Sequence, residues 1–170
     1  MAIKRSKLQH FMNTTPDETT PSGGETYSLM NTGITSLSIN KNPTYLEEGY
    51  IADEVGSKQL ESLAPEFTFE INVDDSDPVS AFLTDLEWED ATLEDVETSI
   101  VSVQLWQTPT GTAPNLLYPA KKYNVSISVE TIGDEALKTL KHSVTAGVMG
   151  DAVFGTFNPN TKAFVEEDED

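Results

Sequence analysis

Residues 66–88 read EFTFEINVDDSDPVSAFLTDLEW and contain the pattern of a strand followed by the pattern of a helix. In the first part, large apolar side chains alternate with Thr68, Glu70 and Asn72, which is the period of two of a half-buried strand. The same alternation recurs in three further segments, residues 37–39, 101–105 and 123–129. Each of these strands is expected to turn one face to a core and the other to water or to a partner.

The second part of the stretch predicts a single amphipathic helix. Asp77 is a good N-cap, and Pro78 suits the first helical position because its ring fixes φ near the helical value. Apolar residues then recur at spacings of three and four and form one stripe: Val79, Phe82, Leu83 and Leu86. We expect the helix to end near Trp88 and to cover one open face of a sheet.

Composition divides the chain into three parts. Residues 13–26 (NTTPDETTPSGGET) are dominated by Thr, Pro, Ser and Gly, which predicts a flexible linker and makes residues 1–12 an arm. Near the other end, apolar segments flank the turn residues 158–160 (NPN), which predicts a hairpin, and the final EEDED is a charge run. We therefore predict a flexible N-terminal arm and linker at 1–26, a β domain at 27–165, and an acidic C-terminal tail at 166–170.

One segment, residues 42–65, is long for a loop between two strands. It carries large apolar side chains that a disordered loop would rarely contain, among them Tyr45, Leu46, Tyr50, Ile51, Val55 and Leu60. The composition predicts an extended hairpin or arm that packs on something else. The alternative, that the segment folds back on its own domain, stays open on the sequence alone.

The formal net charge of the 170 residues is −19, and between Asn42 and Ile100 the only cation is Lys58. A protein this acidic repels a nucleic-acid backbone, so sequence-specific DNA or RNA binding is not expected. The charge suits either a solvated surface tuned for solubility or a salty host, or a surface that must not adhere to a polyanion. The chain has no cysteine, which excludes disulfides and thiolate metal sites, and no apolar run long enough to span a bilayer.

Catalytic constellations are scarce. His10 falls in the predicted arm and His142 in a predicted strand, so no set of nucleophile, base and orienting group can be assembled. The acidic run 74–77 (DDSD) could ligate calcium or magnesium, but it lacks the EF-hand pattern, and a strand end followed by a helix cap is the better interpretation. No cofactor, metal site or catalytic residue is predicted. A hydrolase using a pair of carboxylates remains a minor alternative because acids are abundant.

Five short segments carry a resemblance to a known family. They are residues 50–54 (YIADE), 63–65 (LAP) before the strand at 66–73, 77–79 (DPV), 118–126 (YPAKKYNVS) and 150–162 (GDAVFGTFNPNTK). In this order they resemble motifs of the major tail (tail tube) proteins of bacteriophages with long, non-contractile tails. The likeness runs from about Gly33 to Val165. The chain departs from the pattern at Leu63, where an aromatic residue is expected, in its Thr/Pro-rich linker and in its acidity.

The resemblance implies a fold, a use and partners. The fold would be a mostly β, antiparallel sandwich or half-barrel of two sheets with one flanking α-helix, a long inter-strand loop and flexible termini. Six subunits would form a ring whose inner sheets close around a lumen, and rings would stack into the tube of a virion tail, assembled in the host cytoplasm. The partners would be further copies of the chain and the tape measure, tail terminator and tail tip proteins. Double-stranded DNA would pass through without specific binding.

Two sets of residues receive roles from this resemblance. The long loop would clasp a neighbouring subunit through Tyr45, Leu46, Tyr50, Ile51, Val55 and Leu60. The polar faces of the alternating strands would line the lumen through Glu66, Thr68, Glu70, Asn72, Ser126, Ser128 and Glu130. The alternative function is a surface-displayed, immunoglobulin-like binding or adhesion module, which would be a monomer with a concave aromatic or calcium site.

Overall fold

The computed structural model describes residues 1–16, 25–52 and 54–167 of the chain. One α-helix and eleven strands are found in this part of the chain, together with two short 3-10 turns. The elements in chain order are η1 (Arg5–Lys7), β1 (Leu8–Asn13), β2 (Tyr27–Leu29), β3 (Ile34–Asn40), β4 (Pro43–Glu48), β5 (Ser57–Leu63), β6 (Glu66–Asn72), α1 (Pro78–Trp88), η2 (Leu93–Val96), β7 (Glu97–Gln104), β8 (Tyr118–Gly133), β9 (Lys141–Val148), β10 (Val153–Asn158) and β11 (Ala163–Glu166).

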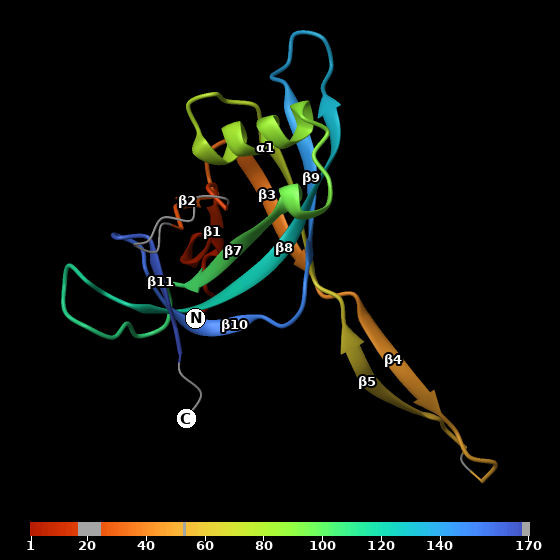
Figure 1. Cartoon of the computed structure of the whole chain (residues 1–170). Helices are drawn as coiled ribbons and strands as arrows, with labels where there is room; N and C mark the ends of the chain where they lie inside the picture. The colour runs from red at the N-terminus through yellow and green to blue at the C-terminus, as the bar shows by residue number, and fades with distance from the viewer. Residues whose placement is uncertain (17–24, 53, 168–170) are drawn as a thin grey trace.

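Nine of these strands form one curled antiparallel sheet, and α1 covers its concave side (Figure 1). The strand order is β2-β1-β7-β8-β9-β6-β3. The long strand β8 joins two parts of the sheet, because its first residues pair with β10 and its later residues pair with β9. The prediction of a mostly β half-barrel with one flanking helix is confirmed.

The main core lies between α1 and the concave face of the sheet. Buried residues alternate along β6, where Phe67, Phe69 and Ile71 point inward. Val79 and Leu83 from the helix stripe are fully buried against them, as the spacing predicted. Burial of each such side chain stabilises the fold by about 1.5–3 kcal/mol.

The predicted start of the helix is also confirmed. The side chain of Asp77 accepts a hydrogen bond from the backbone N–H of Ser80 at 3.0 Å, and Pro78 is the first helical residue. The hydroxyl and amide of Ser76 donate to Asp74 at 2.6 and 2.9 Å, and these bonds lower the pKa of that carboxyl. The acidic run is therefore a turn and a helix cap, which was the favoured interpretation.

The prediction that residues 1–26 form a flexible arm is wrong for β1. This strand pairs with β2 on one side and β7 on the other, and Phe11 and Met12 are buried. A second core cluster on the other face of the sheet, with Tyr27, Val101 and Phe157, explains why β1 shows no alternation. Both faces of β1 carry buried side chains, so the strand has no regular alternation of buried and exposed residues. Residues 17–24 of the predicted linker and residues 168–170 of the predicted acidic tail lie outside the described part of the chain.

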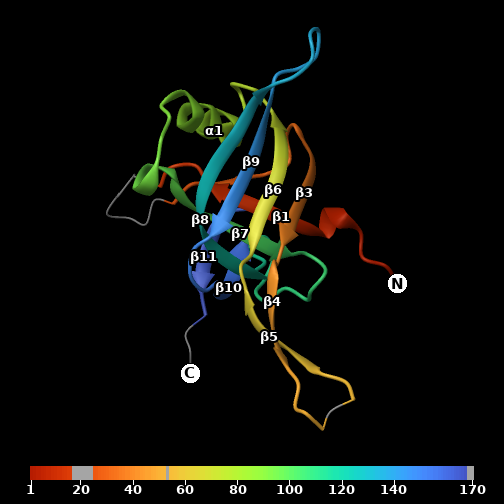
Figure 2. The ribbon, with the colours of Figure 1, turned by 90° about the vertical axis from the view of Figure 1, so that its right-hand side faces the viewer.

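The long segment 42–65 forms a two-stranded hairpin of β4 and β5 that leaves the body (Figures 1 and 2). Every residue of these two strands is exposed. The prediction of an extended hairpin is confirmed, and the alternative that this segment packs on its own domain is wrong. The C-terminal hairpin is also confirmed, since β10 pairs with β11. No helix among the described residues is long and apolar enough to cross a membrane.

Candidate functional site

The projecting hairpin is the first candidate surface. Tyr45 and Leu60 are opposite each other in the β4–β5 register, and both are about half exposed. Towards the tip, Ile51 and Val55 are 110% and 84% exposed. An ion pair on the hairpin, between Lys58 and Glu47, is also exposed, and such pairs contribute little stability.

An isolated two-stranded hairpin is marginally stable in water, and this one carries its apolar side chains into solvent. Contiguous exposed apolar surface of this kind marks an interaction site. The six residues predicted for the arm all lie on this hairpin and are all exposed: Tyr45, Leu46, Tyr50, Ile51, Val55 and Leu60. The structure thus brings the predicted contact residues together on one element. Their partner stays a prediction.

The second candidate surface is the polar face of strands β3, β6, β9 and β8, which Figure 2 views face on. In one row across the four strands, Thr68 pairs with Ser38 and Thr145, and Thr145 pairs with Ser128. Side chains that are directly opposite in an antiparallel sheet lie on the same face, so this row is continuous. We call the surface the polar face.

A second row on the polar face contains Asn40, Glu66, Gly147 and Ser126, and a third contains Glu70, Ser143 and Thr131. Asn72 pairs with Lys141 at the end of β6. Glu130 is exposed and lies where the register between β8 and β9 shifts, which makes it a bulge residue. The seven residues predicted from strand alternation are thus gathered on one region of the sheet. Their position relative to a lumen stays a prediction.

Sequence reasoning missed the contributions of β3 and β9 to the polar face. Residues 143–147 alternate in the same way as β6, so the signal was present in the sequence. The register that places Thr145 between Thr68 and Ser128 could not be predicted from the sequence, because it joins strands that are far apart in the chain.

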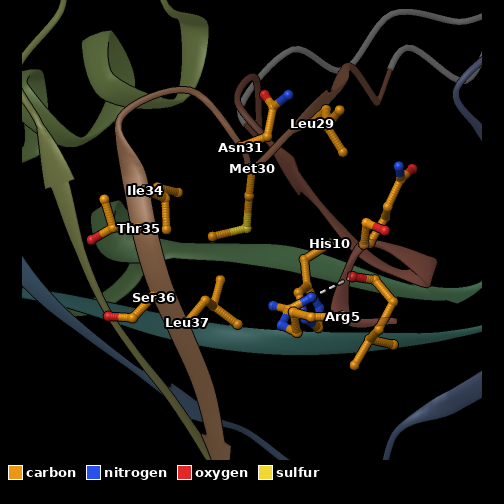
Figure 3. Close-up of a pocket in the computed structure, with 12 residues that line it drawn as sticks. Arg5, His10, Leu29, Met30, Asn31, Ile34, Thr35, Ser36 and Leu37 are labelled. Atoms are coloured by element: carbon orange, nitrogen blue, oxygen red, sulfur yellow. Dashed lines mark hydrogen bonds between the residues drawn. The ribbon is translucent and has the colours of Figure 1, made fainter. Parts of the chain in front are cut away.

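A cavity of about 470 Å³ lies between β1 and β3, and His10 is one of its lining residues (Figure 3). The ring of His10 is buried, and its Nδ1 is 2.8 Å from the hydroxyl of Ser102. Burial, aided by the positive charge of Arg5, lowers the pKa of His10 to about 4, so the ring is neutral at pH 7. The predicted location of His10 in a mobile arm is wrong because β1 is part of the sheet.

The pair of Ser102 and His10 does not form a catalytic triad. The other ring nitrogen of His10, Nε2, has no hydrogen-bond partner among the described residues, so nothing orients the imidazole as a base. Ser102 is itself buried. The second histidine, His142, is fully buried, and its Nε2 lies 3.1 Å from the hydroxyl of Thr84 on α1. Burial lowers the pKa of His142, and its contact with Thr84 joins β9 to the helix, which is a structural role.

In the described part of the chain, no group of three or more His, Asp or Glu side chains is placed so that it could hold a metal ion. The two candidate surfaces are thus an apolar hairpin and a polar sheet face, and both are suited to contacts with other macromolecules.

No protein-family profile and no curated protein matches the sequence. The fold is shared with solved structures, among them two from tails. The tail of an empty GTA particle, which has C6 symmetry, matches with a TM-score of 0.58 at 8% identity, over 90% of this chain and 98% of that one. The SPP1 tail tube matches with a TM-score of 0.56 at 10% identity, over 90% of this chain and 78% of that one.

The chain has the tail tube fold. The fold expected from the five sequence segments is therefore confirmed, and it extends over nine-tenths of the chain. At identities this low, the likeness lies in the arrangement of strands and helix and not in shared side chains. The tail tube fold also gives no support to the immunoglobulin-like alternative.

Proposed function

We propose that this protein is the structural subunit of a bacteriophage tail tube. The observation that carries the proposal is the match of the whole β domain to two tail structures, one of them with C6 symmetry. Six copies would form a ring, and rings would stack into a hollow tube in the virion tail. The protein would act without catalysis, and its main partner would be itself.

The open edge of the sheet supports ring formation. Among the described strands, β3 pairs only with β6, so its other edge is unpaired. Unpaired edges favour pairing with another chain, and closure into a barrel removes them. In the proposed ring, the edge of β3 meets the sheet of the next subunit, and the polar faces of six subunits form the inner wall.

The chemistry of the polar face suits a wall for DNA passage. It combines hydroxyl groups, such as those of Thr68 and Ser128, with the carboxylates of Glu66 and Glu70. Such a surface offers few cations to phosphate groups, so DNA would move past it without being held. The tape measure, tail terminator and tail tip proteins are the further partners that this function requires.

The exposed hairpin would lock the assembly by packing its apolar side chains on a neighbouring subunit. Removal of residues 45–60 tests this role, because the hairpin makes no contribution to either core cluster. The shortened protein is expected to keep its circular dichroism spectrum and thermal unfolding transition and to remain a monomer in sedimentation velocity experiments. Formation of tubes at normal yield by the shortened protein would refute the assignment.

A further inference from the structure

A cavity of about 360 Å³ opens beside the base of the hairpin, between the end of β3 and strands β8 and β10. Its lining includes the apolar side chains of Leu8, Ile39, Trp106 and Phe154, and the two cations Lys41 and Lys121. Lys121 Nζ lies 4.6 Å from the ring centre of Phe154. Lys41 Nζ lies 5.7 Å from the ring centre of Tyr123. We call this cavity the lysine pocket.

Among the described residues, the two lysines of the pocket have no acidic partner. The protein has 29 Asp and Glu residues and only 10 Lys and Arg residues, so a cation would readily find a carboxylate. The four ion pairs of the described residues use Lys58, Lys122, Lys138 and Lys141. Within that part of the chain, no carboxylate lies within 4.0 Å of Lys41 or Lys121. The pocket therefore combines apolar surface with two positive charges that no described carboxylate pairs.

A surface with complementary properties lies where α1 ends and η2 begins. It consists of Trp88, Glu89, Asp90, Leu93, Glu94 and Asp95, and we call it the acidic corner. Trp88 and Leu93 are 84% and 82% exposed, and the four acids are also exposed. No Lys or Arg occurs in the sequence between Lys58 and Lys121, so no nearby residue in the chain neutralises the corner.

The end of α1, where the acidic corner begins, and the elements that line the lysine pocket lie toward opposite ends of the body. In Figures 1 and 2, α1 lies beside the sheet toward its β8–β9 loop, and β10 and the base of the hairpin lie toward the other end. A contact between two different surfaces at opposite ends is heterologous, and it repeats without closing when copies are added along one direction. Stacking of rings into a tube requires this kind of contact.

We infer that the acidic corner of one copy docks in the lysine pocket of the next copy along the tube. The inference rests on the proposed function in one respect, that the partner is a second copy of this chain. Trp88 and Leu93 would cover the apolar lining of the pocket, while the acids pair with Lys41 and Lys121. Inverted contacts, corner to corner or pocket to pocket, would bring like charges together and are therefore disfavoured. The two charged surfaces thus set a single polarity of stacking.

The hairpin tip is the competing occupant, because it too has acids and exposed apolar side chains. The corner is favoured for two reasons. The hairpin leaves the body at the same end as the pocket, so its tip does not face the pocket of a copy stacked end to end. Its strands also carry a cation, Lys58, whereas the corner has none.

Charge reversal and rescue test the inference. Lys41→Glu with Lys121→Glu reverses the pocket, Glu89→Lys with Glu94→Lys reverses the corner, and a four-site variant reverses both. Glu135→Lys, an exposed acid in the β8–β9 loop, is the matched control. Each two-site variant should raise the concentration needed for assembly on the order of tenfold, measured by sedimentation velocity. The four-site variant and the control should assemble like the wild type.

Several outcomes would overturn the inference while leaving the proposed function intact. One such outcome is that the two-site variants assemble at the same concentration as the wild type. Another is that the four-site variant needs as high a concentration for assembly as the two-site variants. Rescue by reversal of hairpin acids Glu48 and Glu54, in place of the corner acids, would show that the hairpin tip occupies the pocket.

Cross-linking separates failure of the inference from failure of the proposed function. The chain has no native cysteine, so Lys121→Cys and Glu89→Cys variants can be mixed under oxidising conditions and checked for a disulfide-linked dimer. Lys121→Cys mixed with Glu135→Cys is the control. A specific dimer from a protein that forms no tubes would support the contact and refute the tube. A monomer that gives no specific dimer would refute both.

Discussion

Acidification is expected to destabilise the fold through His10. The unfolded ring has its ordinary pKa of 6.5, whereas burial beside Ser102 and the charge of Arg5 lower the folded value to about 4. The folded protein therefore binds this proton more weakly than the unfolded chain, and protonation favours unfolding. The contribution of neutral His10 to the free energy of unfolding is fully present above pH 6.5 and is lost as the pH falls toward 4. At about 1.4 kcal/mol per pH unit, the loss amounts to about 3 kcal/mol.

The assay is urea unfolding followed by tryptophan fluorescence at pH 7.5, 6.5, 5.5 and 4.5, with the His10→Phe variant measured in parallel. Phe keeps the ring contact with Phe67, whose centre is 5.8 Å away, and leaves the Ser102 hydroxyl without its partner. The variant should thus be less stable at pH 7.5 but should lose less stability on acidification. Parallel pH profiles for the two proteins would refute the assignment of the titration to His10. Burial also lowers the pKa of His142, which acts in the same direction and is common to both proteins.

Three further variants test the core, the helix cap and the lumen. Leu83→Ala should lower the free energy of unfolding by about 2–4 kcal/mol in chemical denaturation, because Leu83 is fully buried, and a loss below about 1 kcal/mol would contradict the described core. Asp77→Ala should cost about 1 kcal/mol in the same assay through loss of the cap, and an unchanged midpoint would show that the cap is dispensable. Glu66→Lys with Glu70→Lys should permit assembly but slow DNA release from virions, with Glu135→Lys as control; unchanged release would remove these residues from the lumen.

Local patterns predicted the elements whose two faces differ. The alternation of Phe67, Phe69 and Ile71 with polar residues and the stripe through Leu83 each report one covered face and one open face. Strand β1 gave no such signal because core clusters cover both of its faces, and the Thr/Pro-rich segment after it made the whole N-terminus resemble an arm. The projecting hairpin could be predicted because large apolar residues are unusual in a loop.

Surfaces formed by distant segments were beyond the sequence. The residues of the polar face on β6 and β8 could be chosen by alternation, but only the register with β9 joins them into rows. Lys41 and Lys121 are far apart in the chain, and nothing local relates them. The fold brings both to one cavity, and no described Asp or Glu is among the residues that line it.

The most direct test of the tail tube account is electron cryomicroscopy of the purified protein after assembly at high concentration. The account predicts hollow tubes of stacked six-membered rings, with the polar face of β3, β6, β9 and β8 lining the lumen and α1 away from it. Tubes whose lumen is lined by α1, or a protein that stays monomeric at every concentration and salt tested, would contradict it.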